Sequence, residues 1–232
     1  PENWSRIEEA LQIASRIEGL ILVNPNHHLP QSEQTHGANL PSQLLGRKVV
    51  DFHEAVQAES GAYLNFELPL PSDVASYLCT GGTTGLPKIA RHTHWNETCN
   101  VTQLISVLAD FCFAPGHSVL TALPLFHVNA QFGSGLAVFA SGAHAVLAPP
   151  TGYRTPGLLP RFWEIVEHYR LSSFSGVPAI FASLMQVPIA GADISSLRAA
   201  LCGGAPLPVE LAKRVQAETG VRILEGYGLT EG

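Results

Sequence analysis

The sequence predicts an α/β fold in which strands and helices alternate around largely parallel sheets. From Ser72 onward, short runs of apolar and β-branched residues alternate with longer amphipathic segments, the pattern of strand–helix–strand units. Glycine and proline fall at the junctions between these segments, where turns are expected. With 46% hydrophobic and 14% charged residues, the 232-residue chain has enough apolar side chains to bury a sizeable core.

The individual elements follow from local spacing. Trp4, Ile7 and Leu11 recur at helical spacing, so residues 3–18 are expected to form an amphipathic helix. Pro178 suits the first turn of a later helix, and Gly220 is expected to end the last one. Strands are expected at 19–24, 48–52, 74–79, 89–94, 118–123, 142–148, 171–177, 197–204 and 221–228. Further helices are expected at 53–59, 95–110, 156–170, 178–186 and 208–220.

The chain is expected to consist of two parts. Residues 24–46 are rich in Asn, His, Gln, Pro and Gly and are expected to form a long loop. We therefore expect an N-terminal α/β segment, 1–71, that contains this loop, and a core, 72–232, where the alternation of strands and helices is clear. In open sheets of this kind, ligands bind beyond the carboxyl ends of the strands.

Composition excludes some functional classes. A formal charge of −6 argues against a nucleic-acid-binding protein, which normally presents a basic face. Residues 133–150 contain too much Gly, Ala and Pro for a membrane span of ~20 residues, and the polar start of the chain is not a signal peptide. The cysteines form no Cys-x-x-Cys pair, so reduced thiols in a cytoplasmic protein are expected. They are Cys79, Cys99, Cys112 and Cys202.

The segment CTGGTTGLPK (79–88) contains three glycines and three threonines. Glycines let consecutive N–H groups converge on an anion, and threonine hydroxyls add donors that rotate to suit phosphate oxygens. Lys88 adds a mobile positive charge. Residues 80–88, the Gly/Thr loop, therefore have the groups of a phosphate clamp. They are not a Walker A loop, because Ile89 follows Lys88 where that motif has Ser or Thr. A flexible surface hairpin is the alternative interpretation.

The Gly/Thr loop resembles the signature of adenylate-forming enzymes, the family of acyl-CoA synthetases, firefly luciferase and peptide-synthetase adenylation domains. Gly81 in place of a serine and Ile89 in place of a glycine depart from that signature. The matching residues are Thr80, Gly82, Thr83, Thr84, Gly85, Pro87 and Lys88. Three further segments resemble this family in the same order: LPLFHVNA (123–130), CGGAPLP (202–208) and GYGLTEG (226–232).

The resemblance implies that 72–232 is the nucleotide- and acyl-binding core of the large N-terminal domain of such an enzyme, without the small C-terminal lid domain. In the family, ATP activates a carboxylic acid as an acyl-adenylate, and CoA then displaces AMP. ATP, Mg²⁺ and CoA are the implied cofactors, and a fatty or aryl acid is the implied substrate. Because the family's catalytic lysine lies in the lid domain, the chain alone is expected to form adenylate poorly. Its uncovered apolar faces make self-association possible.

The resemblance also assigns roles to residues. Lys88, His127, Thr230 and Glu231 are the implied catalytic residues, and Glu231 is the implied Mg²⁺ ligand. The implied nucleotide contacts are Thr80, Gly81, Gly82, Thr83, Thr84, Gly85, Lys88, Gly203, Gly204, Ala205, Pro206, Gly226, Tyr227, Gly228, Leu229 and Thr230. The acyl pocket is expected to take residues from 127–132, 175–178 and 202–203, which are small or apolar and suit an apolar acid.

Each assignment has an alternative. Tyr227 as a core aromatic, Glu231 as a solvated carboxylate and His127 as a pocket-wall histidine without chemistry are the structural interpretations. At the level of function, the alternatives are an adenylation domain that loads a carrier protein and a catalytically inactive nucleotide-binding module. Gly81 and Ile89 are the departures that keep the inactive module open.

Overall fold

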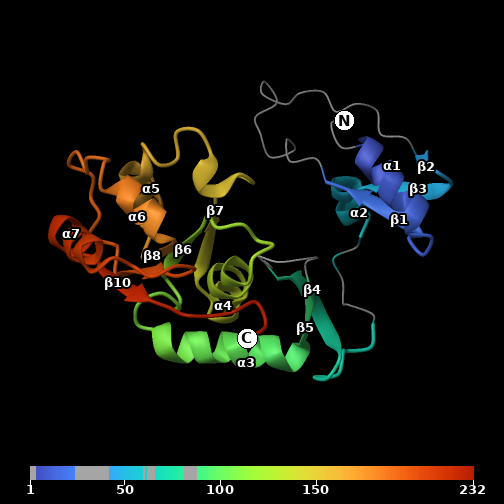
Figure 1. Cartoon of the computed structure of the whole chain (residues 1–232), viewed down its shortest axis with the longest axis horizontal. Coiled ribbons are helices and arrows are strands. Elements are labelled where there is room, and N and C mark those ends of the chain that lie inside the picture. The colour runs from blue at the N-terminus through green and yellow to red at the C-terminus, as the bar shows by residue number, and fades with distance from the viewer. Residues whose placement is uncertain (1–3, 24–41, 60, 62–65, 81–87) are drawn as a thin grey trace. The chain divides into compact units, whose positions relative to one another are not determined.

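The computed structural model describes residues 4–23, 42–59, 61, 66–80 and 88–232. It divides the chain into two compact units, Pro1–Glu67 and Leu68–Gly232 (Figure 1). Among the described residues, no helix has the length and apolar character needed to cross a membrane.

The first unit is a small three-stranded sheet with two helices. Strand β1 runs parallel to β3, and the short β2 pairs antiparallel with the other edge of β3. Arg47 on β3 donates hydrogen bonds to the carbonyls of Leu11 and Ile17, so it binds the chain where the first helix ends. The elements are α1 (Trp4–Ile13), β1 (Gly19–Leu22), β2 (Gln43–Leu44), β3 (Arg47–Asp51) and α2 (Phe52–Ala58).

The second unit combines an antiparallel hairpin with a five-stranded parallel sheet. The hairpin consists of β4 (Val74–Cys79) and β5 (Ile89–Thr93). The sheet has the order β10-β9-β8-β6-β7, and every neighbouring pair is parallel. Its strands are β6 (Ser118–Thr121), β7 (His144–Leu147), β8 (Ser173–Gly176), β9 (Ala199–Cys202) and β10 (Arg222–Glu225). The helices are α3 (His94–Leu108), η2 (Asn129–Leu136, a π-helix), α4 (Ala137–Ala140), η3 (Gly152–Arg154), α5 (Phe162–Tyr169), α6 (Pro178–Leu184) and α7 (Val209–Thr219).

The two faces of the parallel sheet pack against different helices. Because side chains alternate along a strand, neighbouring residues of β6 enter different cores: Val119 packs with α3, η2 and α4, whereas Leu120 packs with α5, α6 and α7. In Figure 1, α3 and α5 accordingly lie on opposite sides of the sheet. Burial on both faces is typical of parallel sheets and leaves the strand ends as the exposed edge for ligands.

The α/β class predicted from the sequence is confirmed, and so are the helix starting at Pro178 and the helix end at Gly220, which adopts φ +71°. Several local predictions differ from the structure. The helix predicted at 156–170 begins at Phe162, and the strand predicted at 221–228 ends at Glu225. The first helix ends at Ile13 rather than at residue 18. Residues 43–44 form β2 inside the predicted loop 24–46, of which residues 24–41 lie outside the described part of the chain. The helical stretch 129–140 was not predicted at all.

Candidate functional site

The candidate site lies at the carboxyl ends of three neighbouring strands, β8, β9 and β10. The Gly203 N–H donates to the carbonyl of Gly176, which ends β8, at 3.2 Å. The Gly226 N–H donates to the carbonyl of Cys202, which ends β9, at 2.8 Å. These bonds continue the strand pairing beyond the ladder, so the turns after β9 and β10 leave the sheet side by side.

The turn 203–208 favours glycine at its first two positions. A Cβ on Gly203 would lie 3.2 Å from the Gly226 carbonyl oxygen, which is tighter than ordinary van der Waals contact. Gly204 has φ +78°, in the left-handed region that favours glycine. A carboxylate oxygen of Glu225 accepts the Leu207 N–H at 3.1 Å and holds the far side of the turn. Ala205 and Pro206 are exposed, so a planar ligand has access to this wall.

The segment 226–232 exposes the side chains of Tyr227, Leu229 and Glu231. Tyr227 is 91% exposed, so the alternative of a core aromatic is wrong. Leu229 and Gly232 exchange two N–H···O bonds, of 3.1 and 3.3 Å, and this closure places Thr230 and Glu231 at the tip of a tight turn. Thr230 is half-buried and Glu231 is exposed.

The ends of the Gly/Thr loop are joined by the hairpin. The Thr80 N–H donates to the Lys88 carbonyl at 2.9 Å, one step beyond the pairing of Cys79 with Ile89. The two strands therefore hold the loop ends together, and the Lys88 side chain is exposed. The other predicted phosphate contacts lie outside the described residues; they are Gly81, Gly82, Thr83, Thr84 and Gly85.

One contact brings the hairpin to the segment 226–232. His92 on β5 is buried, and its Nε2 lies 2.6 Å from the carbonyl oxygen of Thr230. A carbonyl only accepts, so Nε2 is the donor and carries the ring proton. His92 lies four residues after Lys88, and Thr230 precedes Glu231. The contact therefore places β5, the strand that begins directly after Lys88, beside the segment 226–232 within the second unit. In Figure 1 the last segment runs from β10 toward the β4–β5 hairpin.

The sequence alone left His92 as a surface or structural histidine. It lies in HTH (92–94), which resembles the family's continuation directly after the Gly/Thr loop. Such a position does not reveal a partner 138 residues away.

The segment with His127 joins the site from β6. His127 is exposed, and its Nδ1 accepts the Asn129 N–H at 3.3 Å. The side-chain Nδ2 of Asn129 lies 3.6 Å from the place of a Cβ on Gly203, which brings the start of η2 to the turn after β9. Tyr153 is buried, and its hydroxyl donates a hydrogen bond to the Ser175 carbonyl at 2.7 Å, which fixes the end of β8. The three segments predicted for the acyl pocket thus adjoin one another.

Cys202 contributes a neutral thiol to this region. Burial raises its pKa, and the nearby negative charge of Glu225 raises it further. A thiol that resists ionisation is a poor nucleophile, so Cys202 serves as a small wall residue and not as a reactive group.

The residues present fit Mg²⁺ only with phosphate as a co-ligand. The described part of the chain holds no group of three or more His, Cys, Asp or Glu side chains arranged to bind a metal ion. Mg²⁺ in nucleotide sites is commonly bound by one or two carboxylates together with phosphate oxygens and waters. The exposed carboxylate of Glu231 at the turn tip suits such a shared site.

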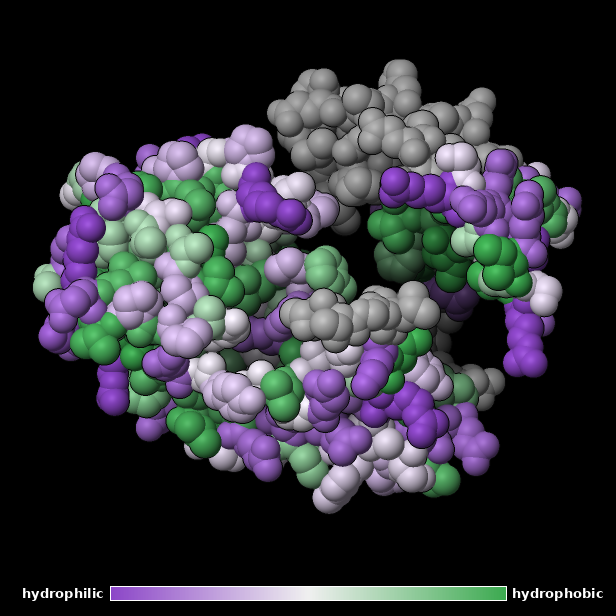
Figure 2. All heavy atoms as spheres, viewed as in Figure 1, coloured by the Kyte–Doolittle hydropathy of each residue, from purple (hydrophilic) through white to green (hydrophobic). Residues whose placement is uncertain are grey.

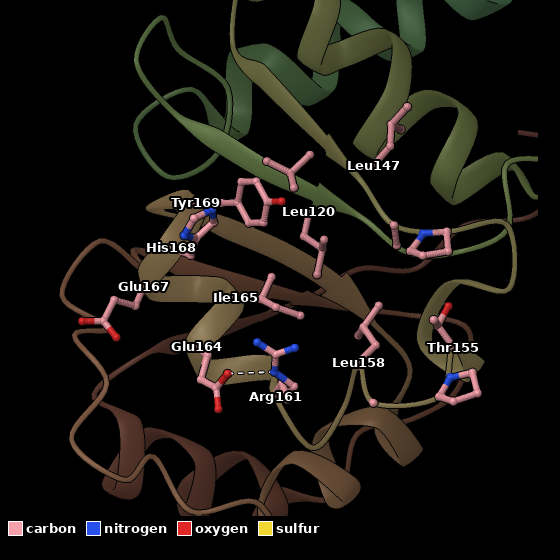
Figure 3. A pocket seen from close by; sticks show the side chains of 15 residues that line it. Leu120, Leu147, Thr155, Leu158, Arg161, Glu164, Ile165, Glu167, His168 and Tyr169 are labelled. Carbon is pink, nitrogen blue, oxygen red and sulfur yellow. Dashed lines mark hydrogen bonds and ion pairs between the residues drawn. The ribbon is translucent and has the colours of Figure 1, made fainter. Parts of the chain in front are cut away.

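A cavity of about 710 Å³ lies elsewhere in the second unit, between β7 and α5. Leu158 and Ile165 face it, and the ion pair of Arg161 with Glu164, at 2.8 Å, lies at its edge (Figure 3). It is lined by none of the residues that the sequence assigns to the nucleotide, and we do not place the nucleotide there.

Comparison with known proteins shows the family of the chain. Residues 13–232 match the AMP-binding enzyme family. The chain belongs to that family. Its fold is that of the N-terminal domain of adenylate-forming enzymes, as the solved structures show. ATP-bound MatB from Rhodopseudomonas palustris aligns with a TM-score of 0.67 and 25% identity over 80% of this chain and 36% of that one. The anthranilate CoA ligase AuaEII, in complex with anthranoyl-AMP, aligns with a TM-score of 0.76 and 21% identity over 99% of this chain and 40% of that one.

Curated relatives of this AMP-binding family member are acyl- and aryl-CoA ligases. The marinolic acid–CoA ligase of Pseudoalteromonas sp. (strain SANK 73390) is 38% identical over 185 residues, which are 78% of this chain and 28% of the relative. The long-chain-fatty-acid–CoA ligase of Yersinia pestis is 33% identical over 239 residues, 99% of this chain and 41% of the relative. The feruloyl-CoA synthase of Amycolatopsis sp is 36% identical over 160 residues, 68% of this chain and 30% of the relative. The chain thus spans less than half the length of these relatives.

Proposed function

We propose that this chain forms the ATP- and acid-binding part of an AMP-forming acid–CoA ligase. The supporting observation is the contact between His92 and Thr230, which joins β5, the strand that follows the Gly/Thr loop, to the segment 226–232. A triphosphate that reaches both motifs would have its β- and γ-phosphates at the loop and its α-phosphate at Thr230. The names of the curated relatives support the same reaction class.

The reaction proceeds in two displacements. A carboxylate oxygen of the acid attacks the α-phosphorus of ATP, the new O–P bond forms, and pyrophosphate leaves with the electrons of the broken P–O bond. The sulfur of CoA then attacks the acyl carbon, loses its proton, and AMP departs. Phosphoryl transfer depends on positioning and charge neutralisation more than on covalent catalysis, which matches the residue types at this site.

The side chains divide this work. The Lys88 ammonium and the loop amides bind the β- and γ-phosphates and neutralise the leaving pyrophosphate. The Thr230 hydroxyl donates a hydrogen bond to an α-phosphate oxygen, and the exposed Tyr227 ring stacks on adenine opposite the 203–206 wall. When bound, Mg²⁺ supplies further charge neutralisation, and Glu231 with the phosphate oxygens would hold it. His127, exposed beside the Asn129–Gly203 contact, borders the acid.

We assign the substrate to carboxylic acids with an apolar chain or ring. The segments 127–132, 175–178 and 202–203 offer small or apolar walls, and such walls favour an apolar ligand. The acids in the relatives' names, marinolic, ferulic and long-chain fatty acids, support this class.

Acid-dependent exchange of pyrophosphate into ATP tests the proposal. In a full-length ligase that carries this chain, fatty or aryl acids are expected to stimulate exchange and amino acids are not. Addition of CoA should then yield the thioester. Exchange driven by amino acids, or transfer only to a carrier protein, would contradict the assignment. For the 232-residue chain alone, we expect ATP binding with slow adenylate formation.

A further inference from the structure

We propose that His92 is a positioning residue for the adenylation reaction, a role that rests on the proposed function of the site. Its imidazole holds the Thr230 carbonyl and so sets the distance between the groups that bind the α-phosphate and those that bind the β- and γ-phosphates.

The His92 ring is held in one orientation. It is 7% exposed on β5, while its neighbour Arg91 is exposed on the opposite face of the strand. The ring lies against Phe132 of η2, with centroids 5.6 Å apart and planes inclined by 35°. Packing against Phe132 restricts the rotation of the imidazole, and this restriction aims Nε2 at Thr230.

The hydrogen bond also fixes the ring's proton. With Nε2 as the donor, a neutral imidazole leaves Nδ1 as the unprotonated nitrogen. At 2.6 Å the bond is short, and the group that receives it is a half-buried backbone carbonyl. The bond therefore acts on the main chain of Thr230 and leaves the Thr230 hydroxyl available for a ligand.

The geometry of the segment 226–232 makes this bond influential. Within the part of the chain that the structure describes, hydrogen bonds join the segment to the rest of the unit near its two ends: Gly226 to Cys202, and Thr230 to His92. The intervening Tyr227 is 91% exposed. Without the imidazole, the closure between Leu229 and Gly232 is the hydrogen bonding that remains at the turn tip with Thr230 and Glu231 among the described residues.

The other end of the connection is the Gly/Thr loop. Strand β5 begins at Ile89, directly after Lys88, and β5 pairs with β4 up to the loop ends. The paired backbone of β5 thus fixes the distance between His92 and Lys88. The imidazole thereby couples the position of Lys88 to that of Thr230, which is what an in-line displacement at the α-phosphorus requires.

Two substitutions separate the effect of the hydrogen bond to Thr230 from the effect of ring packing on Phe132. His92→Phe keeps an aromatic contact with Phe132 and removes the donor, whereas His92→Gln keeps a donor and removes the ring. His168→Gln, on the exposed face of α5, is the matched control.

Calorimetry with ATP and ligand-observed NMR with adenosine measure affinity in the 232-residue chain, and circular dichroism measures the melting temperature. We expect His92→Phe to weaken ATP binding about tenfold without changing adenosine binding, His92→Gln to stay within about threefold, and His168→Gln to match the unaltered chain.

The outcomes are distinct. If His92→Phe binds ATP as tightly as the unaltered chain, the positioning role is wrong and the proposed function stands. If His92→Phe loses ATP and adenosine binding equally, His92 is merely structural and the proposal is also wrong. If the unaltered chain binds no ATP, the proposed function and this proposal fall together.

A measurement without substitutions covers the case in which His92→Phe does not fold. Nitrogen-15 NMR of the unaltered chain should show the His92 proton on Nε2, and this signal should shift on addition of ATP and not of adenosine. A proton on Nδ1, or a signal unaffected by ATP, would overturn the proposal.

Discussion

Tyr227 is the residue whose exposure most directly suggests a ligand. A tyrosine ring that is 91% exposed contributes little to packing, yet this one follows directly on the backbone contact between Gly226 and Cys202. The turn 203–208 leaves the sheet beside it, with Gly203 in close contact with the Gly226 carbonyl and Gly204 at a positive φ. A flat base between this turn and the Tyr227 ring would bury both surfaces.

Removal of the Tyr227 ring should therefore affect binding and not stability. We expect Tyr227→Ala to weaken ATP binding about tenfold, since stacking of a base on an aromatic ring contributes roughly 1–3 kcal/mol. The urea midpoint of unfolding should stay that of the unaltered chain. Calorimetry and urea titration measure the two quantities, with Tyr169→Ala on α5 as the control. A large loss of stability with unchanged affinity would mean that the ring packs instead of binding.

Asp193 gives the chain a pH-dependent contribution to stability. Hydrogen bonds from Ser195, and then from Arg170, lower the pKa of its carboxyl to about 2 from 3.8. Because the folded state favours the carboxylate, this contribution is present above pH 3.8 and is lost as pH falls toward 2. The urea midpoint of unfolding should fall between about pH 6 and about pH 3, and this fall should be smaller in Asp193→Asn than in the unaltered chain. Equal falls would show that Asp193 makes no such contribution.

At the scale of elements, the β4–β5 hairpin is the part that local sequence predicts best. Strand β4 occupies Val74–Cys79, the residues predicted, because alternating apolar side chains and a following turn are local signals. The stretch 129–140 was missed because Gly133 and Gly135 disfavour helices. There, burial of Phe132 and Val138 against the sheet outweighs propensity.

The candidate site could be predicted in its parts, but not the contact that joins them. Residue type pointed to Lys88 as a phosphate contact, and the family resemblance implied the 203–206 turn and Thr230. The contact between His92 and Thr230 joins residues 138 positions apart, and no local pattern encodes such a pairing. The alignment of β8, β9 and β10 decides which turns become neighbours, and strand order is a property of the whole sheet.

The hairpin also supplies a chemical reporter of ligand binding. Cys79, at the end of β4 beside the Gly/Thr loop, is exposed, whereas Cys112 and Cys202 are buried with pKa values raised by that burial. Iodoacetamide should therefore label Cys79 well before those two. Saturating Mg·ATP should slow labelling of Cys79 in proportion to occupancy, while the partly exposed Cys99 on α3 reacts at an unchanged rate. Peptide mass spectrometry measures both rates. Equal labelling of Cys79 with and without nucleotide would contradict a phosphate site at the loop.

At the scale of the whole molecule, the proposed contacts all belong to one unit. Residues 68–232 contain the hairpin, the parallel sheet and both hydrophobic cores of that sheet. The surface seen in Figure 2 mixes hydrophobic with hydrophilic side chains. On α3, for example, Trp95 is 62% exposed and Val107 is 74% exposed. The second unit thus has its own core but also apolar residues at its surface.

Expression of residues 68–232 by themselves tests this division. We expect a cooperative thermal transition and an ATP affinity within about threefold of that of the 232-residue chain, because the first unit contributes no proposed ligand contact. Circular dichroism and calorimetry measure these properties. A folded 68–232 that no longer binds ATP, while the longer chain does, would place part of the site in the first unit.

The central claim is that the Gly/Thr loop and the segment 226–232 bind one ATP together. Calorimetric titration of Mg·ATP into the unaltered chain, Lys88→Met and Thr230→Val tests it most directly, with the exposed Lys213→Met on α7 as the control. The account predicts one ATP per chain and a loss of at least about tenfold in affinity for each site variant, since both remove a hydrogen bond to a charged phosphate. It also predicts no change for Lys213→Met. Unchanged affinity in either site variant, or no binding by the unaltered chain, would contradict it.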